Sequence, residues 1–180
     1  MSEYRLKVPF DKDEIKALVA GDRVYLTGKI MTGRDAAHKR LFECIKKGEP
    51  LPVDLKGQAI YYVGPCRKDG KIVSAGPTTS MRMDAFAPTL YDEGVLATIG
   101  KGDRSKEVYD AIVRNGGVYL ASVGGAGALY AQCIKSAKVL AYEDLGTEAI
   151  YEFDVENMPC IVAIDSEGKT TYQNSLCAEC

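Results

Sequence analysis

The feature that most constrains the fold of this chain is an arrangement that occurs four times along it. Each copy has a short apolar strand, a glycine-rich turn, and a segment with the apolar spacing of a helix; the turns lie at residues 28–33, 76–77, 100–102 and 124–127. Strands that alternate with helices favour an α/β domain, in which helices pack on a mixed sheet. If the strands run alike, the turns that follow them face one edge of the sheet, where such folds commonly present ligand-binding groups.

The rest of the chain fits the same class of fold. Alternating apolar residues and turn signals predict further strands, and glycine stops or hydroxyl and acidic caps delimit the helices. One hairpin is expected through Asp69-Gly70, between the strands at residues 59–63 and 71–75, and another through Glu167-Gly168, between the strands at residues 159–165 and 169–172. The strand that starts at Arg23 is expected to end at Gly28. We predict strands at residues 4–8, 23–27, 59–63, 71–75, 95–99, 118–123, 138–142, 150–155, 159–165 and 169–172, and helices at residues 11–18, 34–45, 105–115, 128–134 and from 78 onward.

Composition sets the broad class of protein. A chain of 180 residues with 46% hydrophobic content can bury one sizeable core, so we expect a single domain over residues 1–180. The net charge of −2 argues against the basic surface of a nucleic-acid binder. The N-terminus lacks the apolar stretch of a signal peptide, and no run approaches the ~20 apolar residues that cross a bilayer. We therefore expect a cytoplasmic protein without membrane contact.

The six cysteines give no sign of a disulfide scaffold or of a metal site. They are scattered along the chain, as expected for small apolar residues in a reducing compartment. Cys177 and Cys180 form half of a metal-binding knuckle, but the chain offers no second pair at suitable spacing. We expect no metal ion bound by this chain, and the sequence leaves the role of these last two cysteines open.

The stretch Gly76-Pro-Thr-Thr-Ser-Met-Arg-Met83 has the composition of an anion-binding turn. Its three hydroxyl residues are good caps for the free amides of a helix, so a helix is expected to start near Thr78. Thr78 and Arg82 would then share one helix face beside those amides. An arginine fork can bind both oxygens of a carboxylate. The alternative, an ordinary capped helix with a solvated arginine, stays open at this point.

Two more cations lie in comparable turns. Arg34 stands where a strand meets the start of a helix, and Lys101 lies between two glycines after another strand. Together with Arg82, they would form a receptor for a small dianion such as a dicarboxylic acid. The chain shows no catalytic triad or cofactor loop that would transform such a ligand, so these residues look like half of an active site.

Two other motifs are weaker signals of function. His38 is the only histidine, and no serine, cysteine or second histidine lies near it in sequence, which favours a structural role over catalysis. The glycines at residues 124–127 do not have the spacing of a dinucleotide-binding turn. Close packing of the backbone explains these glycines without a cofactor.

Three motifs in order carry a resemblance to a known family. They read Thr32-Gly-Arg-Asp-Ala-Ala-His38, Gly76-Pro-Thr-Thr-Ser-Met-Arg-Met-Asp84 and Ile99-Gly-Lys-Gly102. In this order they resemble the β-subunit, or C-terminal domain, of the iron–sulfur hydro-lyases, which include class I fumarase and L(+)-tartrate dehydratase. The similarity extends over residues 22–165.

The resemblance implies a swivelling β/β/α fold and an α-subunit that is absent here. That partner would hold a [4Fe–4S] cluster through its own three cysteines, with one iron left open as a Lewis acid for the substrate hydroxyl. It further implies that Arg34, Arg82 and Lys101 hold the substrate carboxylates and that Thr78 is the proton-abstracting base. His38 and Thr79 are secondary candidates for the site.

The resemblance does not choose the substrate. The first of the three motifs is more similar to fumarases, which favours the reversible hydration of fumarate to L-malate, a step of the tricarboxylic acid cycle. The second is also similar to L(+)-tartrate dehydratase. The resemblance suggests an α2β2 assembly. Two non-catalytic hypotheses remain. The chain is either a free-standing module that binds dicarboxylates, or an assembly subunit whose glycine turns only pack against a partner.

Overall fold

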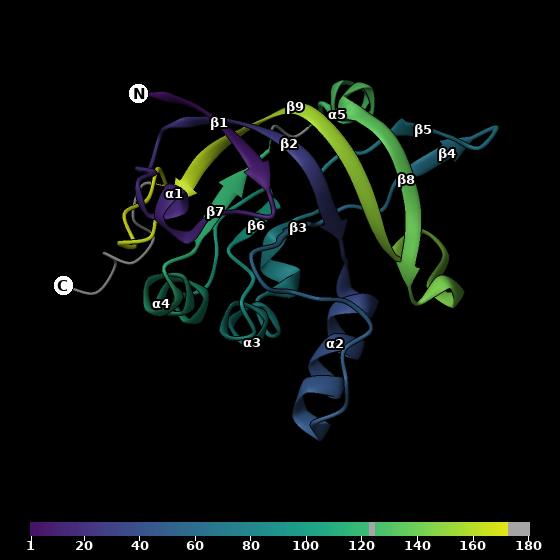
Figure 1. The fold of residues 1–180 in the computed structure, drawn as a ribbon, viewed down its shortest axis with the longest axis horizontal. Helices are drawn as coiled ribbons and strands as arrows, with labels where there is room; N and C mark the ends of the chain where they lie inside the picture. Colours follow the sequence, from purple (N-terminus) through teal and green to yellow (C-terminus); the bar gives the residue numbers. More distant parts are fainter. Residues whose placement is uncertain (123–124, 173–180) are drawn as a thin grey trace.

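The computed structural model describes residues 1–122 and 125–172. Figure 1 shows the strands at the centre, with α2, α3 and α4 on one side of them and α5 at the opposite end of the view. The strands are β1 (Glu3–Val8), β2 (Arg23–Thr32), β3 (Ala59–Tyr61), β4 (Cys66–Lys68), β5 (Lys71–Ser74), β6 (Ala97–Gly100), β7 (Val118–Ala121), β8 (Ile134–Ala141) and β9 (Ile150–Ile164). The helices are α1 (Lys12–Lys16), α2 (Asp35–Lys47), α3 (Ala87–Asp92), α4 (Lys106–Asn115) and α5 (Gly127–Cys133), with 3₁₀ turns η1 (Ser80–Met83) and η2 (Glu143–Glu148).

The main sheet is mixed and curls back on itself. Its strand order is β1-β2-β3-β6-β7-β9-β8, and β2 also pairs with β9. The neighbours β1–β2–β3–β6–β7 run parallel, whereas β9 runs antiparallel to β2, β7 and β8. Because β9 joins β7 to β2, the strands β2, β3, β6, β7 and β9 form a closed ring. The predicted α/β class with a mixed sheet is confirmed.

Alternation along the strands divides the apolar residues between the inside and the outside of this ring. Tyr61 and Val63 belong to the core cluster to which every strand of the ring contributes. Ile60 and Tyr62 belong instead to a cluster that contains residues of α2 and α3. A third cluster joins α3 and α4 to β7 and the end of β9. The end of β3 therefore lies between the filled ring and the helices, where the candidate site is built.

Three expectations about the strands are wrong. β2 does not stop at Gly28 but continues to Thr32, because Gly28 takes up an irregularity in the pairing with β9 at a positive φ of 119°. The two strands expected at residues 150–155 and 159–165 are one strand, β9. The hairpin expected after it is reduced to a single bridge between Ile164 and Thr170.

The shorter elements agree better with expectation. The expected turn through Asp69 and Gly70 forms, with both residues at positive φ, but the strand that precedes it in the hairpin is β4, because β3 pairs with β2 and β6 instead. α2 and α4 end at Gly48 and Gly116, each in the left-handed conformation. No helix among the described residues is long and apolar enough to cross a membrane.

Candidate functional site

The first part of the site is the junction between β2 and α2. Arg34 takes the N-cap position of α2 with an extended backbone, and its carbonyl oxygen accepts the His38 N–H at 2.9 Å. Its Nε lies 3.7 Å from Glu148 Oε1 and 4.0 Å from Asp35 Oδ2. Gly64 leaves room for this side chain, because a Cβ there would lie 2.9 Å from Arg34 Nη1. The guanidinium is thus confined beside the segment that follows β3.

The second part is a pair of turns that lie side by side. Thr78 donates its N–H to the Tyr62 carbonyl oxygen at 2.7 Å, and its own carbonyl oxygen accepts the Lys101 N–H at 3.4 Å. The Ser80 N–H in turn donates to the Lys101 carbonyl oxygen at 2.9 Å, and Thr79 forms a parallel bridge with Lys101. The Thr78 segment therefore extends the sheet beside the end of β6.

This pairing overturns the predicted helix at Thr78. The helical piece is η1, a 3₁₀ turn of 4 residues, and Thr79 occupies its N-cap without a side-chain capping bond. The amides of Thr78 and Ser80 are already used by carbonyl oxygens of neighbouring segments. The expected cluster of free helix amides does not form around Thr78, so any positive potential there comes from side chains.

Arg82 completes the site from the end of η1. Its Nε donates to Asp35 Oδ1 at 3.0 Å, and its Nη2 lies 2.9 Å from Asp35 Oδ2. Asp35 also faces Arg34, so one carboxylate lies between the two arginines that the sequence singled out. The Arg82 side chain is 51% exposed, compared with 26% for Arg34, so both guanidinium groups reach the surface.

The predicted residues thus form two neighbouring pairs. Arg34 and Arg82 meet at Asp35, and Thr78 and Lys101 are joined through their backbones. The pairs adjoin at the end of β3, where Tyr62 accepts from Thr78. The Lys101 side chain is exposed and makes no ion pair with any described residue, and the Thr79 side chain is exposed as well.

His38 lies beneath this surface and is fully buried. Its Nδ1 is 2.8 Å from the Arg34 carbonyl oxygen, and its ring meets that of Tyr62 edge-on, with centroids 5.1 Å apart. Burial lowers the pKa of His38 to about 4, so the imidazole is neutral at neutral pH. The neutral ring donates from Nδ1 to the carbonyl, which leaves Nε2 as an acceptor.

Buried polar atoms without a hydrogen bond concentrate at the start of α2. Among the described residues they are Arg34 Nε, His38 Nε2 and Asp35 Oδ2, and the last of these still has the Arg82 ion pair at 2.9 Å. Buried polar groups are nearly always paired, with protein, water or ligand. This end of α2 is therefore a place where a bound polar molecule would complete the hydrogen bonding.

Sequence reasoning assigned no role to Asp35 or Glu148, although both touch the Arg34 guanidinium. Asp35 was visible as the acidic residue directly after Arg34, in the first turn of a predicted helix. Glu148 had no such signal, because only the fold brings η2 against α2.

The glycine turn at residues 124–127 and the potential metal ligands can also be compared with the structure. Gly127 packs against the backbone of Gly76, where a Cβ on Gly127 would lie 3.2 Å from the Gly76 nitrogen. This agrees with the interpretation of that turn as close packing, although residues 123 and 124 lie outside the described part. No group of three potential metal ligands occurs among residues 1–122 and 125–172, and Cys177 and Cys180 lie outside that range.

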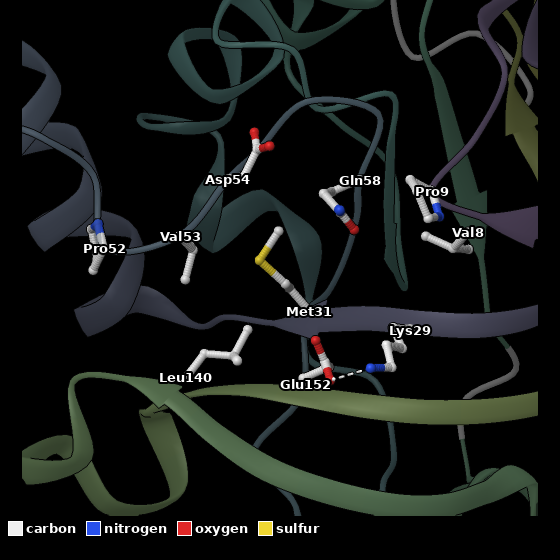
Figure 2. Close-up of a pocket in the computed structure, with 10 residues that line it drawn as sticks. All are labelled: Val8, Pro9, Lys29, Met31, Pro52, Val53, Asp54, Gln58, Leu140 and Glu152. Atoms are coloured by element: carbon white, nitrogen blue, oxygen red, sulfur yellow. Dashed lines mark ion pairs between the residues drawn. The ribbon is translucent and has the colours of Figure 1, made fainter.

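A separate cavity of about 320 Å³ lies between β2, β8 and the loop that precedes β3. Figure 2 shows the ion pair between Lys29 and Glu152 on its floor and the apolar side chains of Val53 and Leu140 on its wall. Arg34, Thr78, Arg82 and Lys101, all within the described part of the chain, do not line it. The candidate site is thus distinct from this cavity.

Fumarate hydratases are among the known proteins with similar sequences. The family described as Fumarase C-terminus matches residues 2–175. Fumarate hydratase 2 of Leishmania major is 38% identical over 95% of this chain, and the anaerobic class I fumarate hydratase of Escherichia coli is 41% identical over 88% of it. The chain spans about a third of the length of these relatives, 31% and 30% respectively.

A relative of similar length has a different name. The putative L(+)-tartrate dehydratase subunit beta of Methanocaldococcus jannaschii is 42% identical over 90% of this chain and 87% of its own length. The matched family covers both the β2–α2 junction and the paired turns at Thr78 and Lys101. The chain therefore belongs to the Fumarase C-terminus family.

Proposed function

We propose that this chain is the β-subunit of a two-component hydro-lyase that reversibly hydrates fumarate to L-malate. The observation that carries the proposal is the convergence of Arg34 and Arg82 on one carboxylate, next to the paired turns that hold Thr78 and Lys101. The membership in the Fumarase C-terminus family supports the same class of reaction. In this proposal, Arg34, Arg82 and Lys101 bind the two carboxylates of the substrate.

The contacts within the chain suit this role. Arg82 turns its Nε and Nη2 toward Asp35, and the Nε of Arg34 faces Glu148 and Asp35. No hydrogen bond among the described residues uses the Nη atoms of Arg34. The protein's own carboxylates thus face Nε of both arginines and Nη2 of Arg82, and the other terminal nitrogens are left for a ligand.

Local charge also favours an anion. The cations Arg34, Arg82 and Lys101 are opposed by Asp35 and Glu148, which leaves an excess of positive charge before a substrate binds. Binding would exclude water, which strengthens each remaining interaction.

Thr78 is proposed as the base that removes the proton from the carbon next to a carboxylate. A hydroxyl ionises only with strong help, and the amides of the Thr78 segment are occupied. The help must come from the cationic side chains of Arg82 and Lys101 and from closure of the site by the partner. Thr79, whose side chain is exposed beside it, is the secondary candidate.

The proposed partner is an α-subunit with a [4Fe–4S] cluster, assembled with this chain as α2β2. When bound, such a cluster supplies a Lewis acid for the hydroxyl that leaves or arrives. The described residues of this chain offer no site for it. The steps assigned here are therefore those of its own side chains: binding carboxylates, orienting them, and moving a proton at Thr78.

Dehydration of L(+)-tartrate is the second candidate, favoured by the relative from Methanocaldococcus jannaschii, of which the chain covers 87%. Tartrate carries one more hydroxyl than malate, and discrimination between such acids rests on one or two hydrogen bonds. Comparison of the two rates in one preparation of the complex decides between these substrates.

The deciding experiment is anaerobic co-expression with an iron–sulfur α-subunit, followed by assays with fumarate, malate and L(+)-tartrate. We expect activity only in the complex. Titration calorimetry of this chain alone with fumarate, malate and ADP tests the other classes. Tight dicarboxylate binding without activity in the complex would indicate a binding module. A stable complex that neither binds dicarboxylates nor shows activity would indicate an assembly subunit.

A further inference from the structure

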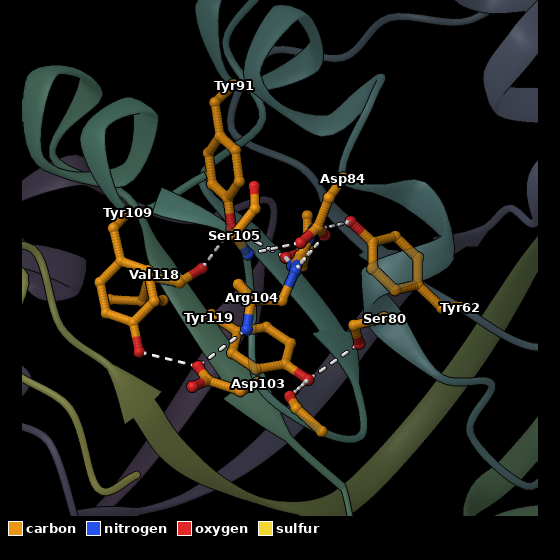
Figure 3. Close-up of polar contacts among 12 residues, drawn as sticks. Tyr62, Ser80, Asp84, Tyr91, Asp103, Arg104, Ser105, Tyr109, Val118 and Tyr119 are labelled. Carbon is orange, nitrogen blue, oxygen red and sulfur yellow. Dashed lines mark hydrogen bonds and ion pairs between the residues drawn. The ribbon is translucent and has the colours of Figure 1, made fainter. Parts of the chain in front are cut away.

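A buried arginine lies directly behind the turns of the proposed site. The Arg104 side chain is 0% exposed, and its Nε donates to Asp84 Oδ1 at 2.7 Å. Its Nη1 donates to Thr98 Oγ1 at 2.9 Å and its Nη2 to the Tyr62 hydroxyl at 3.2 Å. Figure 3 shows this guanidinium at the centre of the contacts, between Asp84 and Tyr62.

Each partner of Arg104 belongs to a segment that carries a site residue or bonds to one. Asp84 is the C-cap of η1, two residues after Arg82. Tyr62 provides the carbonyl oxygen that accepts the Thr78 N–H. Arg104 itself follows Lys101 by three residues. One guanidinium therefore joins the Thr78–Arg82 segment, the strand that leads to Lys101 and the end of β3.

Further bonds strengthen the same connection. The second oxygen of Asp84 accepts the Ser105 N–H at 2.6 Å, beyond Arg104 in the same loop. The Tyr119 hydroxyl bonds both Ser80 Oγ and the Gly102 carbonyl oxygen, each at 2.8 Å. The guanidinium also lies over the rings of Tyr62 and Tyr119, at 5.3 and 4.8 Å from their centroids. The loop after β6 and the η1 turn are thus locked to each other.

Stability alone is a poor reason for such a pair. A buried ion pair loses much hydration, and well-packed apolar residues often replace one without loss of stability. An apolar side chain could not direct bonds to η1, to β6 and to the end of β3 together. A lysine could not either, because it lacks the planar fork.

We propose that Arg104, paired with Asp84, is a positioning residue of the hydro-lyase site, which sets the Lys101 loop against the Thr78–Arg82 segment. Arg104 is buried and would not touch the substrate; it acts through the segments it joins. The inference rests on the proposed function for its effect on catalysis. Its structural part, the coupling of the two turns, can be measured without any activity.

The test compares Arg104→Lys with Arg114→Lys. Arg114 is a matched control, because it binds Asp92 through Nε at 2.8 Å and Nη2 at 2.7 Å on the exposed surface of α4. In the isolated chain, amide hydrogen exchange is measured at Thr78, Ser80 and Lys101, whose N–H groups bond across the turns. We expect Arg104→Lys to accelerate exchange at these amides at least tenfold relative to the amides of α2, whereas Arg114→Lys leaves the ratio unchanged.

The same variants are then assayed in the complex with the α-subunit. We expect Arg104→Lys to lower kcat at least tenfold and to raise KM, and Arg114→Lys to match the wild type. Asp84→Asn should reproduce the exchange pattern of Arg104→Lys. Unchanged exchange at the three amides in a folded Arg104→Lys variant overturns the inference, as does wild-type kcat and KM. If the wild-type complex is inactive but Arg104→Lys still accelerates exchange in the isolated chain, the proposed function is overturned and the coupling of the turns stands.

Discussion

Arg82 and Asp35, 47 residues apart in sequence, form a side-on ion pair in which Arg82 Nε donates to Asp35 Oδ1 at 3.0 Å. The same carboxylate lies 4.0 Å from Arg34 Nε. Asp35 therefore determines how close the two guanidinium groups are and which of their nitrogens face outward. Its second oxygen lies 2.9 Å from Arg82 Nη2, so both oxygens of the carboxylate face the Arg82 guanidinium.

The first prediction concerns this carboxylate. Asp35→Asn removes the charge that orients Arg82, and we expect KM for the dicarboxylate to rise roughly tenfold with a smaller effect on kcat. Asp110→Asn, which breaks the exposed ion pair with Lys106, is the control and should leave both constants unchanged. Steady-state kinetics of the complex measure both. A lower KM in Asp35→Asn would mean that Asp35 acts mainly by repelling the substrate.

The second prediction concerns Thr78. Loss of the base slows the chemical step more than it weakens binding, so Thr78→Ala should lower kcat by roughly 100-fold or more with little change in KM. Arg82→Ala should damage both constants, because its guanidinium binds the substrate throughout the reaction. Thr171→Ala, an exposed threonine elsewhere on the chain, is the control. An unchanged kcat in Thr78→Ala would remove Thr78 from the chemistry.

The third prediction uses pH. The pKa of His38 is about 4 in the folded chain, against 6.5 for an ordinary histidine, so the unfolded chain binds more protons between these values. The contribution of His38 to the free energy of unfolding is complete above pH 6.5 and decreases as pH falls toward 4. Over this range the free energy of unfolding loses about 3 kcal/mol from His38.

Urea unfolding of the isolated chain at several pH values from 7.5 to about 4.5 measures this dependence. His38→Phe removes the titrating group and fills a similar volume, so its stability should depend less steeply on pH in that window. The carboxylates titrate in both proteins, and the difference between them isolates His38. Parallel pH profiles would contradict a buried, neutral imidazole.

The fourth prediction concerns the close approach of the two turns. Gly100 precedes Lys101, and a Cβ there would overlap Ser80 Oγ and lie 3.0 Å from Tyr62 Cδ2. Gly100→Ala should therefore destabilise the fold by about 1–3 kcal/mol and reduce activity, because it separates the segments that hold Thr78 and Lys101. Gly76→Ala is the control, since its nearest contact would be an ordinary 3.6 Å from Gly127 Cα. Thermal unfolding and the hydration assay test both variants, and equal effects of the two would contradict the argument.

Much of the fold could be predicted because its signals are local. The turn between β4 and β5 follows from Asp69-Gly70, and both longer helices, α2 and α4, end at glycines that adopt the left-handed conformation. The candidate residues Arg34 and Lys101 were identified by their place after strands, which local spacing is sufficient to show.

The wrong expectations arose where distant segments compete with local preference. Thr78, Thr79 and Ser80 have the composition of helix caps, but carbonyl oxygens of Tyr62 and Lys101 take the amides of Thr78 and Ser80. Pairing with the residues that follow β3 and β6 therefore replaced the first turn of the expected helix. Similarly, residues 156–158 read as a break, yet pairing with β2 continues on both sides of a bulge there, so β9 runs through them as one strand.

The sequence by itself determined the strand–turn–helix order, the family motifs and the kinds of side chain available to bind an anion, because these depend on neighbours a few residues apart. Only the tertiary structure decided that β9 closes the ring, that Asp35 joins Arg34 to Arg82, and that Arg104 lies buried behind the turns. These relationships depend on packing between residues tens of positions apart, and no local preference encodes which distant partner a side chain will meet.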